Sequence, residues 1–158
     1  MQLEGNLSLR EAREYLGLKG RVRVEAHRDL NGAVGSYLGR TRFGTHRIAI
    51  SVGNARLGRG ELTAKDDIAR TIWHELAHAL QCERDFGGDR RKFVKAYLSE
   101  LTQVFGRKLD PKTKLALYNE DSEAFLAKYK SVSFEAEAYA IGDALAGVSL
   151  TFEERKAV

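Results

Sequence analysis

The chain changes its hydrophobic pattern once, near residue 60, and this change limits the folds that it can adopt. Residues 21–26 alternate, with valine and alanine side chains on one face and charged side chains on the other, which is typical of a half-buried strand. Residues 36–43 and 46–53 predict two further strands in a hairpin relation. A Gly/Arg-rich stretch, 53–62, predicts a mobile loop after them. The first part of the chain therefore predicts a small sheet.

From residue 63 onward, apolar residues recur at helical spacing. This order predicts an α+β fold, in which a small N-terminal β-sheet is followed by a helical half. A length of 158 residues suits a single domain, 1–158. The expected helices are 7–17 before the sheet, with Ser8 and Glu11 at capping-box spacing, then one from Thr63 or Asp66 to Cys82, one with the stripe Phe93, Tyr97, Leu101 and Val104, one opening at Asp110-Pro111, one over 121–129, and one from Ser131 or Ser133 to Gly147.

The composition is that of a soluble globular protein, with 43% apolar and 30% charged residues. No apolar run approaches the roughly 20 residues that span a bilayer, and the first residues lack the pattern of a secretory signal. The single cysteine, Cys82, cannot form an internal disulfide. We therefore expect a cytoplasmic protein without a membrane-spanning segment, in which Cys82 is a buried and inert thiol.

The net charge of +4 is unevenly distributed along the chain. Residues 1–60 hold 11 Lys/Arg against 5 Asp/Glu, whereas residues 61–158 hold 15 against 17. A basic half can attract nucleic acid or an acidic partner, although it is more often only a solvated surface. No helix-turn-helix pattern accompanies it. Its main arginines are Arg21, Arg23, Arg28, Arg40, Arg42, Arg47, Arg56 and Arg59.

The stretch TIWHELAHALQ, residues 71–81, contains two histidines four positions apart, with a glutamate directly after the first. On a helix, His74 and His78 lie on one face one turn apart, where both imidazoles can bind the same ion. Glu75 lies about 100° round the helix from His74, so it can reach a water on that ion without being a ligand. The spacing predicts a zinc site with Glu75 as its base.

The apolar residues of the same helix favour this interpretation. At about 100° per residue they gather on one side, almost opposite to the two histidines. Trp73 and Ala77 nevertheless adjoin the histidine face, so we expect a second apolar layer to cover it. The alternative is a fortuitous histidine pair on a solvated face, which predicts no bound metal. The core-facing stripe consists of Ile68, Ala69, Ile72, Leu76, Ala79 and Leu80.

A catalytic zinc site usually has three protein ligands, and the strongest source of the third is the stretch 131–147. Glu135 and Glu137 begin a helix there whose other residues are mostly small, and small residues let two helices approach closely. A glutamate near a helix start can also serve only as a favourable charge for the helix dipole. The two remaining histidines lie in the strand region. A thiolate ligand from Cys82 would instead close a structural site.

HExxH followed by a glutamate in an E-x-x-A helix resembles the gluzincin metalloproteases, and the short form is similar to the minimal gluzincin domains of bacteria and phages, such as the ImmA/IrrE-like proteins. The resemblance covers about residues 20–147 and implies that Glu135, three positions before Ala138, is the third ligand. An Asp or Asn often follows that alanine and orients a ligand. Here Tyr139 stands in its place, either to bond a ligand or substrate or simply to pack. SprT-like proteases usually take a third histidine, and none follows His78.

The resemblance implies a zinc-dependent metallopeptidase that hydrolyses peptide bonds in a specific protein or peptide substrate. His74, His78 and Glu135 would hold Zn²⁺, which lowers the pKa of a water towards about 7 and polarises the scissile carbonyl. Glu75 would take the proton of the attacking water and pass it to the leaving amine.

The group that stabilises the oxyanion is left open, with Tyr139, Tyr129 and His46 as candidates. By the same resemblance, strand 46–53 would be an edge strand that pairs with an extended substrate. A second hypothesis is a zinc-stabilised regulatory or DNA-associated module with little or no protease activity, supported by the basic residues 1–60. Binding of that kind would weaken steeply with salt.

Overall fold

The computed structural model describes residues 5–28, 30, 33–51, 61–64, 66–153 and 155–156. Most of the loop expected over 53–62 lies outside these ranges. The strands are β1 Gly5–Ser8, β2 Val22–His27, β3 Gly35–Arg40, β4 His46–Ser51, β5 Glu61–Ala64, β6 Val148–Glu153 and β7 Arg155–Lys156. The helices are α1 Leu9–Leu16, α2 Asp66–Phe86, α3 Arg90–Phe105, α4 Pro111–Glu120, α5 Ser122–Ser131 and α6 Ser133–Ala144. The α+β class is confirmed.

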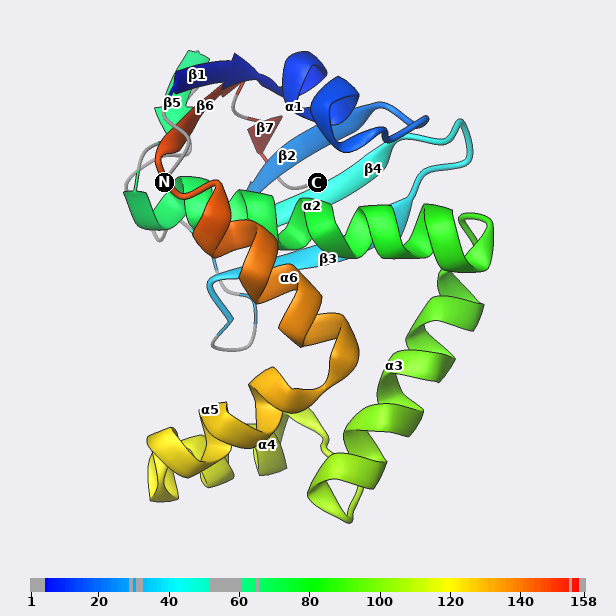
Figure 1. The fold of residues 1–158 in the computed structure, drawn as a ribbon, viewed down its shortest axis with the longest axis vertical. Helices are drawn as coiled ribbons and strands as arrows, with labels where there is room; N and C mark the ends of the chain where they lie inside the picture. Colours follow the sequence, from blue (N-terminus) through cyan, green and yellow to red (C-terminus); the bar gives the residue numbers. More distant parts are fainter. Residues whose placement is uncertain are drawn as a thin grey trace.

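The larger sheet has four strands in the order β3-β4-β2-β7 (Figure 1). β3 and β4 form the expected antiparallel hairpin, while β4 and β2 run parallel. The expectation that strand 46–53 forms an edge is wrong, because β4 pairs on both sides and β3 is the edge strand. Both strands are short, and only the parallel pairing with β2, which leaves no local pattern in the sequence, makes β4 central.

A second sheet of three strands, in the order β1-β6-β5, is absent from the sequence-based expectations. β6 pairs antiparallel with β5 and parallel with β1. The pairing with β1 brings residues near the two ends of the chain together. The sequence of β6 alternates between apolar and polar residues, which is the pattern of a strand, and its apolar residues Val148, Leu150 and Phe152 are buried. β1 directly precedes α1, which begins after Ser8 with the expected capping box to Glu11.

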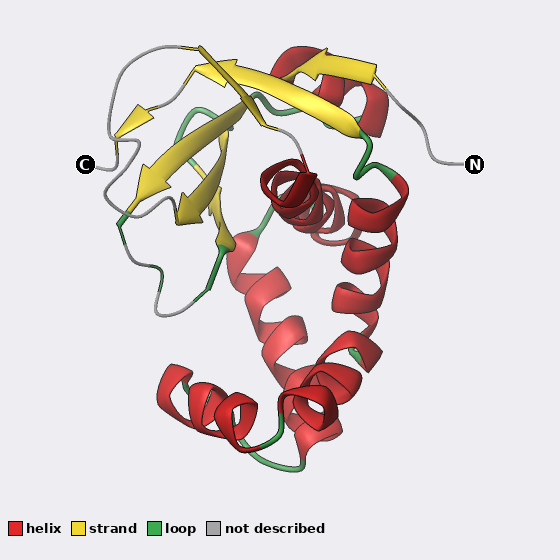
Figure 2. Cartoon of the chain, turned by 90° about the vertical axis from the view of Figure 1, so that its left-hand side faces the viewer, coloured by secondary structure: helices red, strands yellow, loops and turns green. Residues whose placement is uncertain are grey.

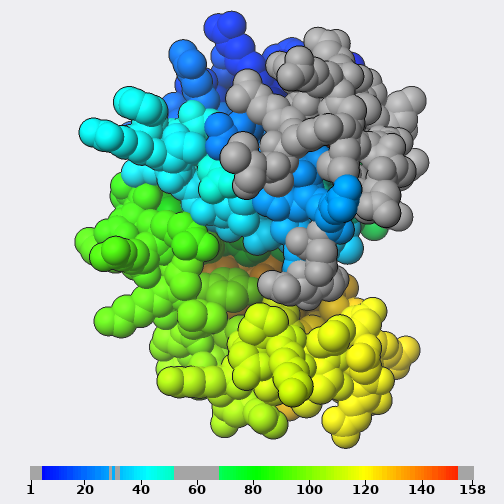
Figure 3. Space-filling model, turned by 180° about the vertical axis from the view of Figure 1, so that it is seen from behind, coloured from blue at the N-terminus to red at the C-terminus, as the bar shows by residue number. Residues whose placement is uncertain are grey.

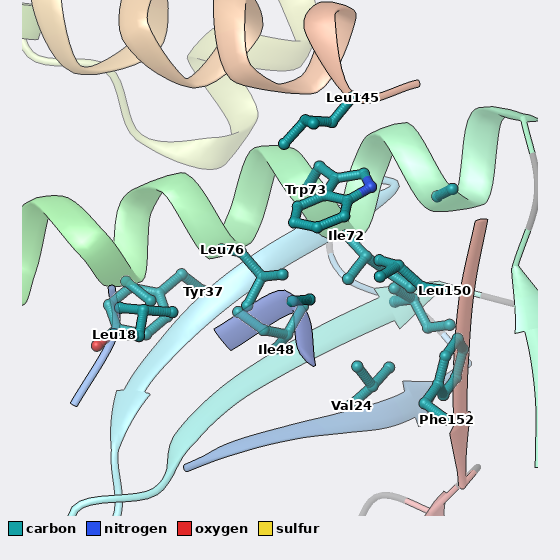
Figure 4. Close-up of a cluster of buried hydrophobic side chains, with 14 of the residues drawn as sticks. Leu18, Val24, Tyr37, Ile48, Ile72, Trp73, Leu76, Leu145, Leu150 and Phe152 are labelled. Atoms are coloured by element: carbon teal, nitrogen blue, oxygen red, sulfur yellow. The ribbon is translucent and has the colours of Figure 1, made fainter. Parts of the chain in front are cut away.

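Helix α2 lies across the larger sheet and provides much of the core (Figures 1 and 4). The predicted stripe is confirmed. Four of its members are fully buried, and Ile68 and Leu80 pack partly buried against them. Ile72 and Leu76 lie over the sheet near Ile48 of β4 (Figure 4). Trp73 is also fully buried, and its indole N–H donates to the Val148 carbonyl at 3.0 Å.

Helix α1 lies with the strands, whereas α3 to α6 lie on the other side of α2, so α2 runs between two layers (Figures 1 and 2). This is the second layer that the sequence predicts over the histidine face. Asp89 and Asp110 cap α3 and α4, with Pro111 in the first turn as expected. α2 extends one turn beyond the predicted end at Cys82, to Phe86. Gly87 and Gly88 then take positive φ angles, which end the helix.

Candidate metal centre

Three side chains from two helices meet on the face of α2 that points away from the larger sheet. Glu135 of α6 places Oε1 2.8 Å from Nε2 of His74 and 3.2 Å from Nε2 of His78. Their ligand atoms all lie within 4.8 Å of one another, and Glu135 is only 1% exposed. The structure thus brings together the three residues that the sequence and the resemblance select as ligands.

The small residues of α6 explain how a short carboxylate reaches α2. At Gly142, an added Cβ would lie 3.2 Å from the Arg70 carbonyl oxygen and 3.6 Å from Cβ of His74. Ala138, one turn before Gly142 on the same side of α6, is fully buried. Larger side chains at these two positions would hold the helices apart and withdraw Glu135 from the histidines.

Gln81 fixes the orientation of the second histidine. Its Oε1 lies 2.9 Å from Nδ1 of His78, and its Nε2 donates to the Phe134 carbonyl at 2.8 Å and to Glu137 at 3.0 Å. Because the amide nitrogen is used in this way, Oε1 accepts from an Nδ1–H. Nε2 of His78 therefore faces Glu135, to which it donates when it is protonated, and it offers its lone pair to an ion when it is not. Gln81 was not identified from the sequence, although its place three residues after His78 on the helix was a usable signal.

Two tyrosines complete the surroundings of Glu135. The hydroxyl of Tyr97 on α3 donates to Oε2 of Glu135, and it lies 2.9 Å from the hydroxyl of Tyr129 on α5. Oε1 is thereby left for the histidines or for an ion that they share. The sequence placed Tyr97 in an apolar stripe, which is correct for its ring, but the stripe gives no information on where the hydroxyl points.

The residues of this cluster shift one another's pKa values. Burial raises the pKa of Glu135, but hydrogen bonds from His74 and His78 outweigh it and hold this pKa well below its usual range. Burial lowers the pKa of His78, but the hydrogen bond and charge of Glu135 outweigh it and raise this pKa to about 9. A cation that binds here therefore replaces a proton between the histidines and the carboxylate.

Glu75 lies beside the ligands, between α2 and the edge strand β3, and is 8% exposed. Burial raises its pKa, while His78 and His74 act in the opposite direction. The backbone N–H of Tyr37 donates to its carboxylate. The close approach of β3 requires glycine at position 35, since a Cβ there would lie 2.5 Å from Cγ2 of Thr71 and 3.3 Å from Cγ of Glu75.

The other carboxylate and the thiol that the sequence left open do not join the ligands. Glu137 accepts hydrogen bonds from the two terminal guanidinium nitrogens of Arg84, at 2.9 and 3.1 Å, and from the amide of Gln81. Its role is to hold the Gln81 amide and the end of α2. Cys82 is fully buried beside Tyr37, as expected for an inert thiol.

Tyr139 contacts the centre through its ring. The ring stands edge-on to that of His74, with centroids 4.6 Å apart and an interplanar angle of 73°. The Nζ of Lys130 lies 4.8 Å from the ring centroid, and the ring of Tyr129 stands edge-on at 6.5 Å. Burial raises the pKa of the Tyr139 hydroxyl to about 12. The packing alternative is thus present in the structure, and a direct catalytic role for Tyr139 stays a prediction.

His46 is fully buried, with both ring nitrogens engaged. Nδ1 lies 2.9 Å from the hydroxyl of Tyr37, and Nε2 contacts the carboxylate of Glu83. Glu83 also accepts the backbone N–H groups of Lys19 and Gly20, at 2.8 and 2.9 Å. His46 therefore ties β4 to the segment before β2, and these bonds leave neither nitrogen free to donate to an oxyanion.

The basic residues of the first part of the chain are partly engaged within the fold. Arg23 and Arg47 both donate to the buried carboxylate of Glu25, at 3.0 and 2.7 Å. Arg56 and Arg59 lie outside the described residues. The described arginines therefore present less free positive charge than the sequence count suggests.

Comparisons with protein-family models, curated proteins and solved structures found no match to this chain. Within the described ranges, no helix combines the length and the apolar character needed to cross a membrane. The case for a function therefore depends on the geometry and chemistry of the His74, His78 and Glu135 cluster.

Proposed function

We propose that the protein is a zinc-dependent metallopeptidase that hydrolyses peptide bonds in a protein or peptide substrate. The observation that carries this proposal is the meeting of His74, His78 and Glu135, with the buried carboxylate of Glu75 beside them. Two imidazole nitrogens and one carboxylate form a donor set used by catalytic zinc sites, and they leave one position open. Zinc bound there would supply an activated water and polarise a carbonyl.

The separations between the ligand atoms support this donor set. Ligands at about 2.1 Å from a tetrahedral zinc lie about 3.4 Å from one another. The two nitrogen-to-oxygen separations here are 2.8 and 3.2 Å, so small side-chain rotations would admit the ion. Two of the three ligands are held in place, His78 by the hydrogen bond that it donates to Gln81 and Glu135 by the one that it accepts from Tyr97.

Glu75 has the position and the environment of a general base. Burial raises the pKa of its carboxyl, which brings its affinity for a proton closer to that needed near neutral pH. The N–H of Tyr37 holds the carboxylate against β3. Glu75 would take a proton from the attacking water and pass it to the leaving amine.

The edge strand β3 takes the role expected for residues 46–53. It lies against α2 at Thr71 and Glu75, and its outer backbone groups are not paired with any described strand. An extended peptide could add to this edge and pass its backbone in front of the centre. The bulge between Tyr37 and Gly39 would interrupt this pairing towards the end of β3.

Metal content and hydrolysis test the proposal together. Wild type purified without chelators should contain one equivalent of zinc, which His74→Ala and Glu135→Ala lose. Glu137→Ala is the matched control on α6 and should keep it, because Glu137 contacts Arg84 and Gln81 instead. Glu75→Gln should also keep the zinc but lose at least 100-fold in cleavage of a mixed peptide library.

Two results would overturn the proposal. One is the absence of zinc from wild type after reconstitution, and the other is full peptidase activity in Glu75→Gln. A zinc-stabilised regulatory or DNA-associated module would give a third result, namely bound zinc, no hydrolysis, and DNA binding that weakens steeply between 50 and 200 mM salt. The engagement of Arg23 and Arg47 by Glu25 makes this alternative weaker.

A further inference from the structure

Lys114 of α4 is the cation whose environment the proposed mechanism leaves unexplained. Its Nζ lies 3.5 Å from the hydroxyl of Tyr129 and 4.7 Å from the centroid of that ring. The side chain is partly buried, and burial lowers the pKa of its ammonium group, while attraction to Glu135 and Glu75 acts in the opposite direction. Figure 3 shows the surface hollowed between the strands and α4, with part of α6 at the floor of the recess. Lys114 therefore adjoins the metal centre through Tyr129 and Tyr97, from the same helical layer as α6.

The protons of the two tyrosines determine what Lys114 can do. A carboxylate only accepts, so the single hydroxyl proton of Tyr97 goes to Glu135. The proton of Tyr129 is also used inside this network, because it goes either to the hydroxyl oxygen of Tyr97, 2.9 Å away, or to Glu135, with which Tyr129 also forms a hydrogen bond. Tyr129 thus has no proton left for a substrate, and its oxygen is free to accept from Lys114.

Lys114 itself has donors to spare. An ammonium has three N–H groups, and the Tyr129 hydroxyl accepts at most one of them. Among the described residues, no Asp or Glu oxygen lies within 4.0 Å of its Nζ. The positive charge of Lys114 is half-buried and close to a cluster that can bind a second cation. The carboxylate of Glu135 would have to neutralise both charges, so Lys114 lacks an anionic partner of its own. An anionic oxygen between the two would supply the missing partner.

We infer that Lys114 binds the oxygen of the substrate carbonyl as that oxygen becomes negative, and so completes the site as its oxyanion-stabilising group. This inference rests on the proposed function, because it needs an ion held by His74, His78 and Glu135. It replaces the earlier candidates Tyr129 and His46, whose hydroxyl proton and ring nitrogens are already used. Lys114 does not need to transfer a proton in this role, because its positive charge and its N–H donors stabilise the negative oxygen directly.

The test uses the full-length protein loaded with Co²⁺ in place of zinc, so that ligand binding can be followed in the visible spectrum. Azide is the anionic probe and imidazole the neutral one, and both bind the metal directly. Lys114→Met should weaken azide binding at least tenfold and leave imidazole binding within about twofold of wild type. Lys114→Arg, which keeps the charge, should retain most of the azide affinity. Lys112→Met, at an exposed position of α4, is the matched control and should change neither.

Three outcomes would overturn the inference, and they are distinguishable. Unchanged azide binding in Lys114→Met would remove Lys114 from the anion site while the metal centre stands. Equal weakening of azide and imidazole would show that Lys114 only supports the fold of the site. Failure of the wild type to bind Co²⁺ would overturn the metal centre, and with it the proposed function.

Discussion

At the scale of single residues, both carboxylate oxygens of Glu135 form hydrogen bonds within the candidate centre. Its Oε1 is shared by His74 and His78, and its Oε2 accepts from Tyr97. Removing the Tyr97 hydroxyl would take one hydrogen bond from a buried carboxylate and let it rotate. The tyrosine therefore acts on the metal through the ligand that it holds.

We predict that Tyr97→Phe weakens zinc binding about 10- to 100-fold, as expected for loss of a hydrogen bond to a metal ligand. The dissociation constant should be measured by competition with a chelator. Tyr118→Phe is the control, because Tyr118 is exposed on α4, and its zinc affinity should equal that of wild type. An unchanged affinity in Tyr97→Phe would mean that the bond to Glu135 does not orient the ligand.

At the scale of elements, the distance between α2 and α6 decides whether a site exists. His74 and His78 belong to one helix and Glu135 to the other, so any change in their separation moves the ligands apart. Gly142 lies at the closest approach, against the backbone of Arg70. Overpacking of this contact would act on the fold and on the metal site together.

We predict that Gly142→Leu lowers the free energy of unfolding by about 1–3 kcal/mol, the usual cost of overpacking. Zinc affinity should fall as well, because α6 carries Glu135. Ala140→Leu, on the exposed side of the same helix, is the control and should leave both quantities near wild type. Denaturant unfolding of the apo-protein and chelator competition are the two measurements. A loss of stability with zinc affinity unchanged would show that the helix crossing does not set the ligand geometry.

At the scale of the whole molecule, the centre links parts of the chain that are far apart in sequence. α2 follows the first strands, while α6 leads directly into β6, which joins the second sheet. An ion held between α2 and α6 therefore ties both sheets to the helical layer. Binding of that kind stabilises the folded state alone, since the unfolded chain does not hold the three ligands together.

We predict that zinc at about 1,000 times its dissociation constant adds about 4 kcal/mol to the free energy of unfolding. For a chain of this length, that raises the midpoint of thermal unfolding by about 8–16 °C. Calorimetric scans with zinc and with a chelator would measure the shift. It should vanish in His74→Ala and persist in Glu137→Ala. The same midpoint with and without zinc in wild type would contradict a site that spans α2 and α6.

How much the sequence determined differs between the parts of the molecule. Helical spacing was enough to place His74, Glu75 and His78, because four residues make about one turn and the core stripe fixes which face is free. The second layer over that face followed from Trp73 and Ala77. The second sheet was missed, because the alternation in β6 does not reveal its pairing with residues as distant in sequence as Gly5 and Val148.

By itself, the sequence determined the α+β order, the starts of α1 and α4, and the two histidines with their glutamate, all of which depend on contacts within a few turns of chain. The tertiary structure alone decided which strand forms the edge and where the hydroxyl of Tyr97 and the ammonium of Lys114 point. It also brought Glu135, rather than Glu137, to the histidines. These outcomes depend on how distant elements pack, because a side chain's partner across two helices is set by their crossing and not by its neighbours in sequence.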